Sequence, residues 1–218
     1  MLGPMLRVLI VGLVLLVAVM LAMPRVAPPP EPENATVLPG TRPLPEFSLT
    51  DDDGEPFSKE SLEGRFSLMF FGFTNCPDVC PITLQVLATT IERIEADAPD
   101  AVPEVVFVSV DPHRDTPERI RSYLEGFDAS FMGVTAPDEQ LAPLLGPLGV
   151  SVQKHEHDGE NYNVVHNSTV YFIGPRADWI AVSSAPHVPE TIASDFLKIR
   201  EWYLARPARE LERASPAP

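Results

Sequence analysis

The pattern of apolar and polar residues separates an N-terminal apolar run from a longer region in which strand-like and helix-like patterns alternate. The apolar run extends from Val8 to Met23, and one cation, Arg7, precedes it. Residues 2–6 can lengthen it toward the roughly 20 residues that a membrane-spanning helix needs. No small-x-small cleavage site follows the run. We therefore expect an uncleaved membrane anchor over residues 1–23, with a cleaved signal peptide as the alternative; either one exports the rest of the chain.

Beyond residue 46, short apolar runs typical of strands alternate with segments of helical period. The runs at 65–73 and 105–110 indicate central strands that are buried on both faces. Apolar residues at helical spacing predict an amphipathic helix from Pro81 to about Ala98. The other expected elements are a hairpin over 47–58, a helix with Thr116 as its N-cap, a strand at 131–134, a helix at 138–145, a strand pair over 151–163, strands at 169–173 and 179–183, and a helix at 189–204.

This order of strands and helices is an α/β pattern. It matches a thioredoxin-like fold with an added hairpin, which we place at residues 46–205. The prolines, 25 in all, crowd the stretch from Pro24 to Pro45 and return after residue 206. Proline-rich composition favours extended, poorly packed chain. We therefore expect residues 24–45 to be a linker and residues 206–218 to be a disordered tail.

The net charge limits the kinds of partner that the chain can bind. The formal charge is −15 and the isoelectric point is about 4.6. A phosphate backbone would be repelled by such a surface, so nucleic-acid binding is excluded as a function. A hydrophobic content of 44% is enough for a sizeable core.

Both cysteines of the chain, Cys76 and Cys80, lie between the first central strand and the helix that follows it. The residue before a proline avoids helical dihedral angles, so Pro81 places Cys80 at the helix entrance and Cys76 in the preceding loop. A helix N-terminus favours a thiolate, and we therefore expect it to lower the pKa values of these cysteines. Two adjacent thiols form either a redox-active pair or part of a site for a soft metal.

The spacing of the cysteines favours the metal site. Thioredoxin-type oxidoreductases separate their cysteines by two residues, whereas three lie between Cys76 and Cys80, which leaves room for an ion. Copper(I) suits two thiolates and one imidazole, whereas zinc would need a fourth ligand. His166 is the best candidate for the imidazole because it precedes the strand at 169–173, where a thioredoxin-like fold faces its cysteines. We expect His155 and His157 at a solvated hairpin tip, with a secondary role in metal capture as the alternative. His113 is expected in an acidic turn, with support of the metal site as the alternative, and His187 as a structural residue.

Taken together, these segments resemble the Sco/SenC family of copper-binding, membrane-tethered, thioredoxin-like proteins. The resemblance rests on the segment 71–81 (FGFTNCPDVCP), the segment 111–117 (DPHRDTP), and residues 162–166 (YNVVH) with 171–175 (YFIGP) after them. It covers about residues 46 to 205. It implies a role in assembling the CuA centre of cytochrome c oxidase, by delivering copper, by reducing the cysteines of the target, or by both.

The resemblance also implies site residues and partners. Cys76, Cys80 and His166 would bind one copper ion, Cu(I) or Cu(II), and Asp78 would support these ligands from between the cysteines. We expect Asp111 and Asp115 to support the site as well, and Arg114 to pair with Asp115. The implied partners are the CuA-bearing oxidase subunit, another copper chaperone as donor, and the membrane, with the domain on the exported side (the periplasm in a bacterium).

Two points stay open in the sequence. The family commonly has an acidic residue just before the histidine, where this chain has Val165. The alternative function is a thiol–disulfide oxidoreductase that reduces an oxidase subunit or another exported protein through Cys76 and Cys80. A peroxide-reducing or redox-sensing role is a third reading. Because an oxidised pair offers no thiolate, oxidation of the two cysteines would block copper loading.

Overall fold

The computed structural model describes residues 3, 10–16, 31–156, 162–165 and 168–206. Its strands in chain order are β1 (Ala35–Pro43), β2 (Ser48–Asp51), β3 (Pro56–Ser58), β4 (Ser67–Gly72), β5 (Glu104–Ser109), β6 (Met132–Thr135), β7 (Gln153–Glu156), β8 (Tyr162–Val165), β9 (Val170–Gly174) and β10 (Asp178–Ser183). Its helices are α2 (Val79–Asp97), α3 (Pro117–Leu124), α4 (Asp138–Leu145) and α5 (Pro189–Leu204), with short 3₁₀ turns at Lys59–Leu62 and Pro99–Ala101.

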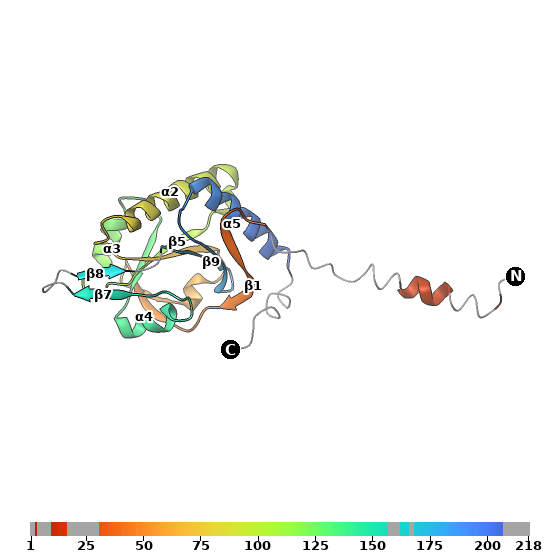
Figure 1. Ribbon diagram of the computed structural model, residues 1–218, viewed down its shortest axis with the longest axis horizontal. Helices are drawn as coiled ribbons and strands as arrows, with labels where there is room; N and C mark the ends of the chain where they lie inside the picture. The colour runs from red at the N-terminus through yellow and green to blue at the C-terminus, as the bar shows by residue number, and fades with distance from the viewer. Residues whose placement is uncertain (1–2, 4–9, 17–30, 157–161, 166–167, 207–218) are drawn as a thin grey trace.

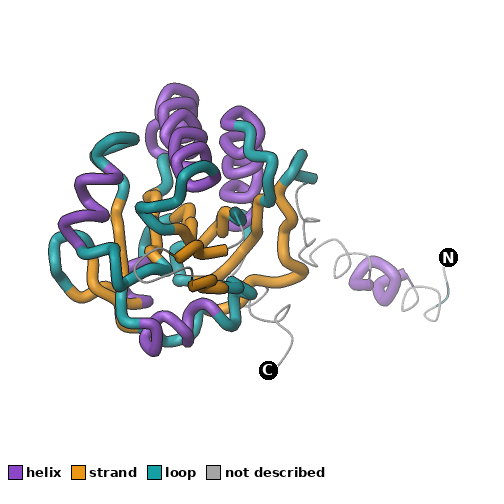
Figure 2. Tube along the Cα trace, turned by 60° about the vertical axis from the view of Figure 1, so that its left-hand side comes forward, coloured by secondary structure: helices purple, strands orange, loops and turns teal. Residues whose placement is uncertain are grey.

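A mixed sheet in the order β1-β10-β9-β4-β5-β6-β2-β3 forms the centre of the domain. Strands β4, β5 and β6 run parallel to one another, and the other neighbours in the sheet pair antiparallel. Helices α2 and α5 lie side by side over one face, and α4 lies over the other (Figures 1 and 2). This α/β architecture confirms the fold class expected from the alternating pattern.

The two central strands are apolar at nearly every position because helices cover both of their faces. All six residues of β4 are buried, as are five of the six in β5. Their parallel register ends with Gly72 opposite Ser109. The loops after β4 and β5 therefore begin at the same edge of the sheet, and these loops carry the cysteine motif and the acidic turn.

Most of the expected elements occur close to their predicted positions. The helix after the cysteines begins at Val79, two residues before Pro81. Thr116 caps α3, its side chain accepting a hydrogen bond from the backbone N–H of Arg119 (3.3 Å), and Pro117 is the first residue of the helix. The expected strand pair over 151–163 is present as β7 and β8, which form a separate two-stranded sheet.

The expectation of a linker up to residue 45 is wrong for residues 35–43. These residues form β1, which pairs antiparallel with β10 at the edge of the main sheet. Two prolines in a strand are compatible with this position because an edge strand has one side on which no N–H donor is needed. Leu44 then donates its N–H to the carbonyl of Ala177 (2.9 Å). The folded domain therefore begins before residue 46.

The N-terminal run expected as a membrane anchor lies mostly outside the described residues. Residues 10–16 are helical. Among the helices that the structure describes, none has the length and apolar character to span a membrane.

Candidate metal and redox site

The two cysteines lie together at the N-terminus of α2. Cys80 is the second residue of the helix, and Cys76 lies in the loop between β4 and α2. The backbone N–H of Cys80 donates a hydrogen bond to Sγ of Cys76 (3.4 Å), and no disulfide joins the two cysteines. This confirms the placement of Cys80 at the helix entrance. The carboxyl end of a central strand and the N-terminus of a helix thus present two sulfur atoms at one edge of the sheet.

The two thiols differ in exposure, and the pKa of the buried one, Cys80, is shifted. Cys80 is fully buried, whereas Cys76 is partly exposed. A hydrogen bond between the two cysteine side chains, together with burial, raises the pKa of Cys80 well above its ordinary value. The expectation that the helix N-terminus lowers this pKa is therefore wrong for the metal-free protein, because the neighbouring sulfur and the loss of water outweigh the helix dipole. The asymmetry leaves Cys76 as the sulfur that solvent or a partner can reach.

Gly72 gives the Cys80 side chain its space. A Cβ atom at position 72 would lie 2.7 Å from Cε2 of Phe107 and 3.0 Å from Sγ of Cys80. Real Cβ atoms do not approach other atoms at the first of these distances, so only glycine fits here without movement of the ring. The last residue of β4 is therefore selected by the packing of Cys80 and Phe107.

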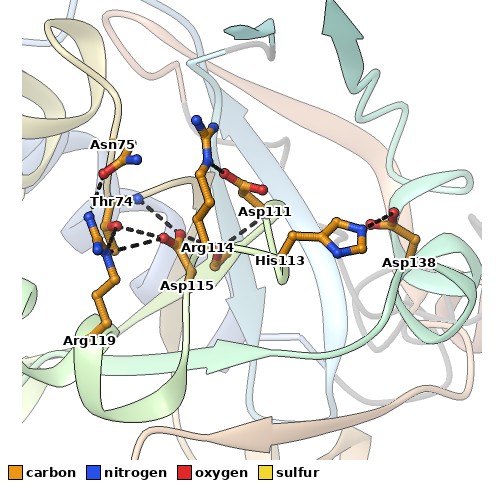
Figure 3. A network of polar contacts seen from close by, with 9 residues as sticks. Thr74, Asn75, Asp111, His113, Arg114, Asp115, Arg119 and Asp138 are labelled. Atoms are coloured by element: carbon orange, nitrogen blue, oxygen red, sulfur yellow. Dashed lines mark hydrogen bonds and ion pairs between the residues drawn. The ribbon is translucent and has the colours of Figure 1, made fainter. Parts of the chain in front are cut away.

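Asp115 joins the loop after β5 to the loop that carries Cys76 (Figure 3). Its carboxylate is buried and accepts hydrogen bonds from the backbone N–H of Thr74 (2.9 Å), from the Thr74 hydroxyl (2.5 Å) and from the Ser109 hydroxyl (2.5 Å). A buried carboxylate needs such donors because burying an unpartnered charge is costly. Asp115 therefore fixes the backbone two residues before Cys76.

Two arginines complete this network, and one of them differs from the expectation. Arg114 pairs with the buried carboxylate of Asp111 and not with Asp115, and its guanidinium lies 5.8 Å from the centre of the Phe73 ring. Arg119, the third residue of α3, takes the predicted place of Arg114 beside Asp115, with 3.9 Å between Nε and Oδ1. The acidic turn is thus held by Asp111, and the cysteine loop by Asp115.

The remaining site residues from the sequence are only partly placed. His166 and His157 lie outside the described residues, and of His155 only the backbone, in β7, is described. Asp78 is the exposed N-cap residue of α2 and makes no side-chain cap hydrogen bond. Among the described residues, no group of three or more His, Cys, Asp or Glu side chains is arranged to hold a metal ion.

The two other histidines have ordinary partners. His113 is largely exposed, with its Nε2 3.7 Å from the Asp138 carboxylate (Figure 3). His187 lies 2.5 Å from the carbonyl oxygen of Ser168 through its Nε2, so it contacts the segment that leads into β9. This contact agrees with the structural role expected for His187.

Three residues that contribute to the site were not singled out from the sequence: Thr74, Ser109 and Arg119. Thr74 stands inside the cysteine motif, but its role depends on contact with Asp115, 41 positions later. Arg119 follows Asp115 by four positions on the chain. That close spacing along the chain was the one available clue, although Asp115 precedes the N-cap of α3 and is not part of the helix.

Comparison with known proteins supports the family expected from the motifs. The SCO1/SenC family model matches residues 38–201. The copper-bound crystal structure of Arabidopsis thaliana ScoI is 30% identical, with a TM-score of 0.68 over 72% of this chain and 98% of that one. The Arabidopsis thaliana mitochondrial protein SCO1 homolog 1 is 33% identical over 158 residues, which is 72% of this chain but only 47% of that protein.

A further solved structure shares the fold at lower identity. BsSco is described as a member of the Sco family of cytochrome c oxidase assembly proteins in which a disulfide switch is identified. It is 22% identical, with a TM-score of 0.61 over 81% of this chain and 98% of that one. The family match runs from within β1 through most of α5 and includes both cysteines and the network around Asp115. The chain belongs to the SCO1/SenC family.

Proposed function

We propose that this protein is a copper metallochaperone that acts in the assembly of the CuA centre of cytochrome c oxidase. The observation that carries the proposal is the pair of adjacent cysteines, not joined by a disulfide, at the N-terminus of α2, one buried and one accessible. Two sulfur donors held this close suit a soft ion, and copper(I) accepts low coordination numbers with thiolate and imidazole ligands. The copper bound to Arabidopsis thaliana ScoI supports the same cargo here.

In this proposal the ion is bound by Cys76, Cys80 and His166, one ion per chain. Loading removes both thiol protons. Because the pKa of Cys80 is raised, an incoming metal ion must displace its proton. Cys76 is the more accessible ligand, so we propose that exchange with a donor or a target begins at its sulfur. Asp115 and Asp111 hold the two loops without contributing ligands, and Asp78 remains at the surface.

The three-ligand site is tested by copper binding to the reduced protein. We expect one copper per chain, with binding severely weakened in Cys76→Ser, Cys80→Ser and His166→Ala. His113→Ala is the matched control because His113 is exposed and paired with Asp138; it should bind copper as the wild type does. Unchanged affinity and spectrum in His166→Ala would show that the third ligand lies elsewhere.

The partners and location follow from the same proposal. The domain receives copper from another chaperone and passes it to the CuA-bearing oxidase subunit, on the exported side of a membrane to which residues 1–23 anchor it. Deletion of the gene should lower oxidase activity and CuA content. Restoration by added copper would support delivery, whereas restoration only by a reductant would support the thiol chemistry described next.

A second function, thiol–disulfide exchange, is favoured by the asymmetry of the two thiols. An exchange reaction needs an accessible attacking sulfur and a nearby second sulfur that completes the disulfide. Cys76 and Cys80 have these properties. In that reaction the target disulfide gains two electrons and the Cys76–Cys80 pair becomes oxidised. Its rate should depend on both cysteines and not on His166, so the variants of the copper experiment also separate the two functions.

A further inference from the structure

The loop that carries Cys76 is tied to the domain on two sides. On the inner side, the buried Asp115 carboxylate holds the backbone and the hydroxyl of Thr74. On the outer side, Arg119 of α3 reaches the same loop (Figure 3). Its Nε donates to Oγ1 of Thr74 (2.8 Å), and one of its terminal nitrogens donates to Oδ1 of Asn75. A single guanidinium thus binds the two residues that immediately precede Cys76.

The hydrogen-bond roles in this arrangement are mutually consistent. The Thr74 hydroxyl has one proton, which it donates to Asp115, and its lone pairs remain free to accept from Arg119. The chain of donors therefore runs from Arg119 through Thr74 to Asp115, and hydrogen bonds in such a chain strengthen one another. Arg119 also lies 3.9 Å from the Asp115 carboxylate, so its positive charge attracts the negative charge of the final acceptor in this series of hydrogen bonds.

A routine surface ion pair is the simpler explanation for Arg119, but it does not account for the geometry. The Arg119 side chain is half exposed, so water screens its long 3.9 Å ion pair with the buried Asp115 carboxylate, and the pair alone contributes little to stability. The planar guanidinium, however, uses two separate nitrogens on two consecutive loop residues, which a point charge such as lysine cannot reproduce. Arg121, on the same helix, instead binds Asp52 and Asp53 in the turn between β2 and β3.

We propose that Arg119 is a positioning residue that holds the Cys76 loop in the geometry required for copper binding. The inference rests on the proposed copper function and extends it. The described partners of Arg119 at this site are Thr74, Asn75 and Asp115. It acts through the loop and supplies no ligand. Without it, Thr74 remains anchored to Asp115, whereas Asn75 loses its link to α3 and Cys76 samples a wider range of positions.

The test compares Arg119→Gln with Arg121→Gln, two matched substitutions on the same helix whose side chains contact different loops. Each reduced protein is titrated with copper(I) against a chromophoric chelator, and the thiolate-to-copper absorption band is recorded after loading with copper(II). Loss of a residue that orients metal ligands typically costs 10–100-fold in metal affinity. We expect Arg119→Gln to weaken copper binding about 10-fold and to shift the band, and Arg121→Gln to change neither. Arg119→Lys should fall between Arg119→Gln and the wild type.

A second variant, at Asn75, removes the hydrogen bond between Arg119 and Asn75 by changing its acceptor. Asn75 is exposed, so Asn75→Ala should not disturb the core. Asn75→Ala and Arg119→Gln should weaken copper binding non-additively, because each breaks the same hydrogen bond. Thermal unfolding of the metal-free variants serves as the control for folding. Asn75→Ala alone should also weaken copper binding, so it keeps the inference testable even if Arg119→Gln is unstable.

The outcomes distinguish a failure of the Arg119 proposal from a failure of the copper-binding proposal on which it rests. If wild-type binding survives Cys76→Ser and Cys80→Ser, the copper proposal itself fails. If wild-type binding requires both cysteines but Arg119→Gln retains full affinity and an unchanged band, Arg119 is not a positioning residue and the copper proposal stands. If Arg121→Gln causes an equal loss, the effect comes from the charge of α3 and the inference is overturned.

Discussion

At the scale of single residues, the space around the Cys80 sulfur depends on the absence of a side chain at Gly72. Gly72 faces Phe107 and Cys80 at distances that exclude a Cβ atom. Gly72→Ala must therefore displace the Phe107 ring or the Cys80 side chain, and overpacking of this kind costs about 1–3 kcal/mol. We expect chemical denaturation to show that loss and copper titration to show weaker binding, because Cys80 is a proposed ligand.

Gly146→Ala is the control for that substitution. Gly146 has helical dihedral angles at the end of α4, and a Cβ there meets only the Ala142 carbonyl at an ordinary 3.5 Å. Replacing glycine where alanine fits stabilises a protein by about 0.4–1 kcal/mol. If Gly72→Ala were equally well tolerated, the close packing of Cys80 against the end of β4 would not be a constraint.

Tyr203 gives a residue-scale prediction for the pH dependence of stability. Its hydroxyl donates to Asp178 (2.8 Å) and accepts from Nε of Arg176 (2.8 Å). Burial and the Asp178 charge raise the pKa of Tyr203 above its ordinary value of about 10. Above about pH 10 the unfolded chain therefore loses a proton that the folded protein keeps, so the free energy of unfolding falls as pH rises.

Denaturant titrations between about pH 9 and 11 measure this dependence. In Tyr203→Phe the phenol is absent from both states, so its contribution to the slope should disappear and the pH dependence should be flatter than in the wild type. An identical slope in the two proteins would mean that Tyr203 ionises as readily in the folded protein as in the unfolded chain.

At the scale of elements, one buried carboxylate joins the first strand to the last helix. Asp195 of α5 is buried, and its two oxygens accept the backbone N–H groups of Glu33 (2.7 Å), Asn34 (2.9 Å) and Ala35 (2.8 Å). Asp195→Asn replaces one acceptor oxygen by an NH₂ group that faces these donors. An unsatisfied buried polar group costs about 1–3 kcal/mol, and we expect a loss of that size in the free energy of unfolding.

Glu201→Gln is the control on the same helix, since Glu201 is exposed and exposed substitutions usually change stability by less than about 0.5 kcal/mol. Hydrogen exchange adds a local measurement. The amides of residues 33–35 should lose protection in Asp195→Asn before those of β4 do. Uniform loss across the domain would contradict a local role for Asp195.

The elements also show why some parts of the fold could be predicted and others could not. The apolar runs of β4 and β5 and the capped start of α3 are local signals, and the structure confirms them. Strand β1 was missed because its prolines suggest an extended linker, and its strand character depends on pairing with β10, more than 130 residues later. An edge strand requires little from its own sequence.

The same distinction applies to the site. The motif located both thiols and the helix entrance, because the spacing of Cys76, Cys80 and Pro81 is a local property. The raised pKa of Cys80 was not predictable, since it depends on burial and on where the neighbouring sulfur lies. Arg119 was missed for a related reason: its partners Thr74 and Asn75 lie more than 40 positions earlier.

At the scale of the whole molecule, the sheet connects the N-terminal segment to the site through a short series of neighbours. β1 pairs with β10, β10 with β9, and β9 with β4, which leads into the cysteine loop. Ser168, held by His187, stands just before β9. The edge strand β1 is therefore connected through β10 and β9 to the strand that positions the site. Removing β1 tests whether the stability of the site depends on the complete sheet.

A chain shortened to begin at Glu46, the boundary that composition alone suggests, should be much less stable than one that begins at Glu31. The shorter chain lacks β1, which leaves β10 as an unpaired edge and Asp195 without its three backbone donors. Exposed edges favour association between chains, and the unpartnered carboxylate alone costs about 1–3 kcal/mol. Denaturation and light scattering of the two proteins measure both effects. Equal stability and equal monomer content of the two proteins would show that pairing of β1 with β10 does not stabilise the domain. The expected result is that the cysteine site forms fully only in the chain that retains residues 31–45, because the sheet that carries the site is complete only with its first strand.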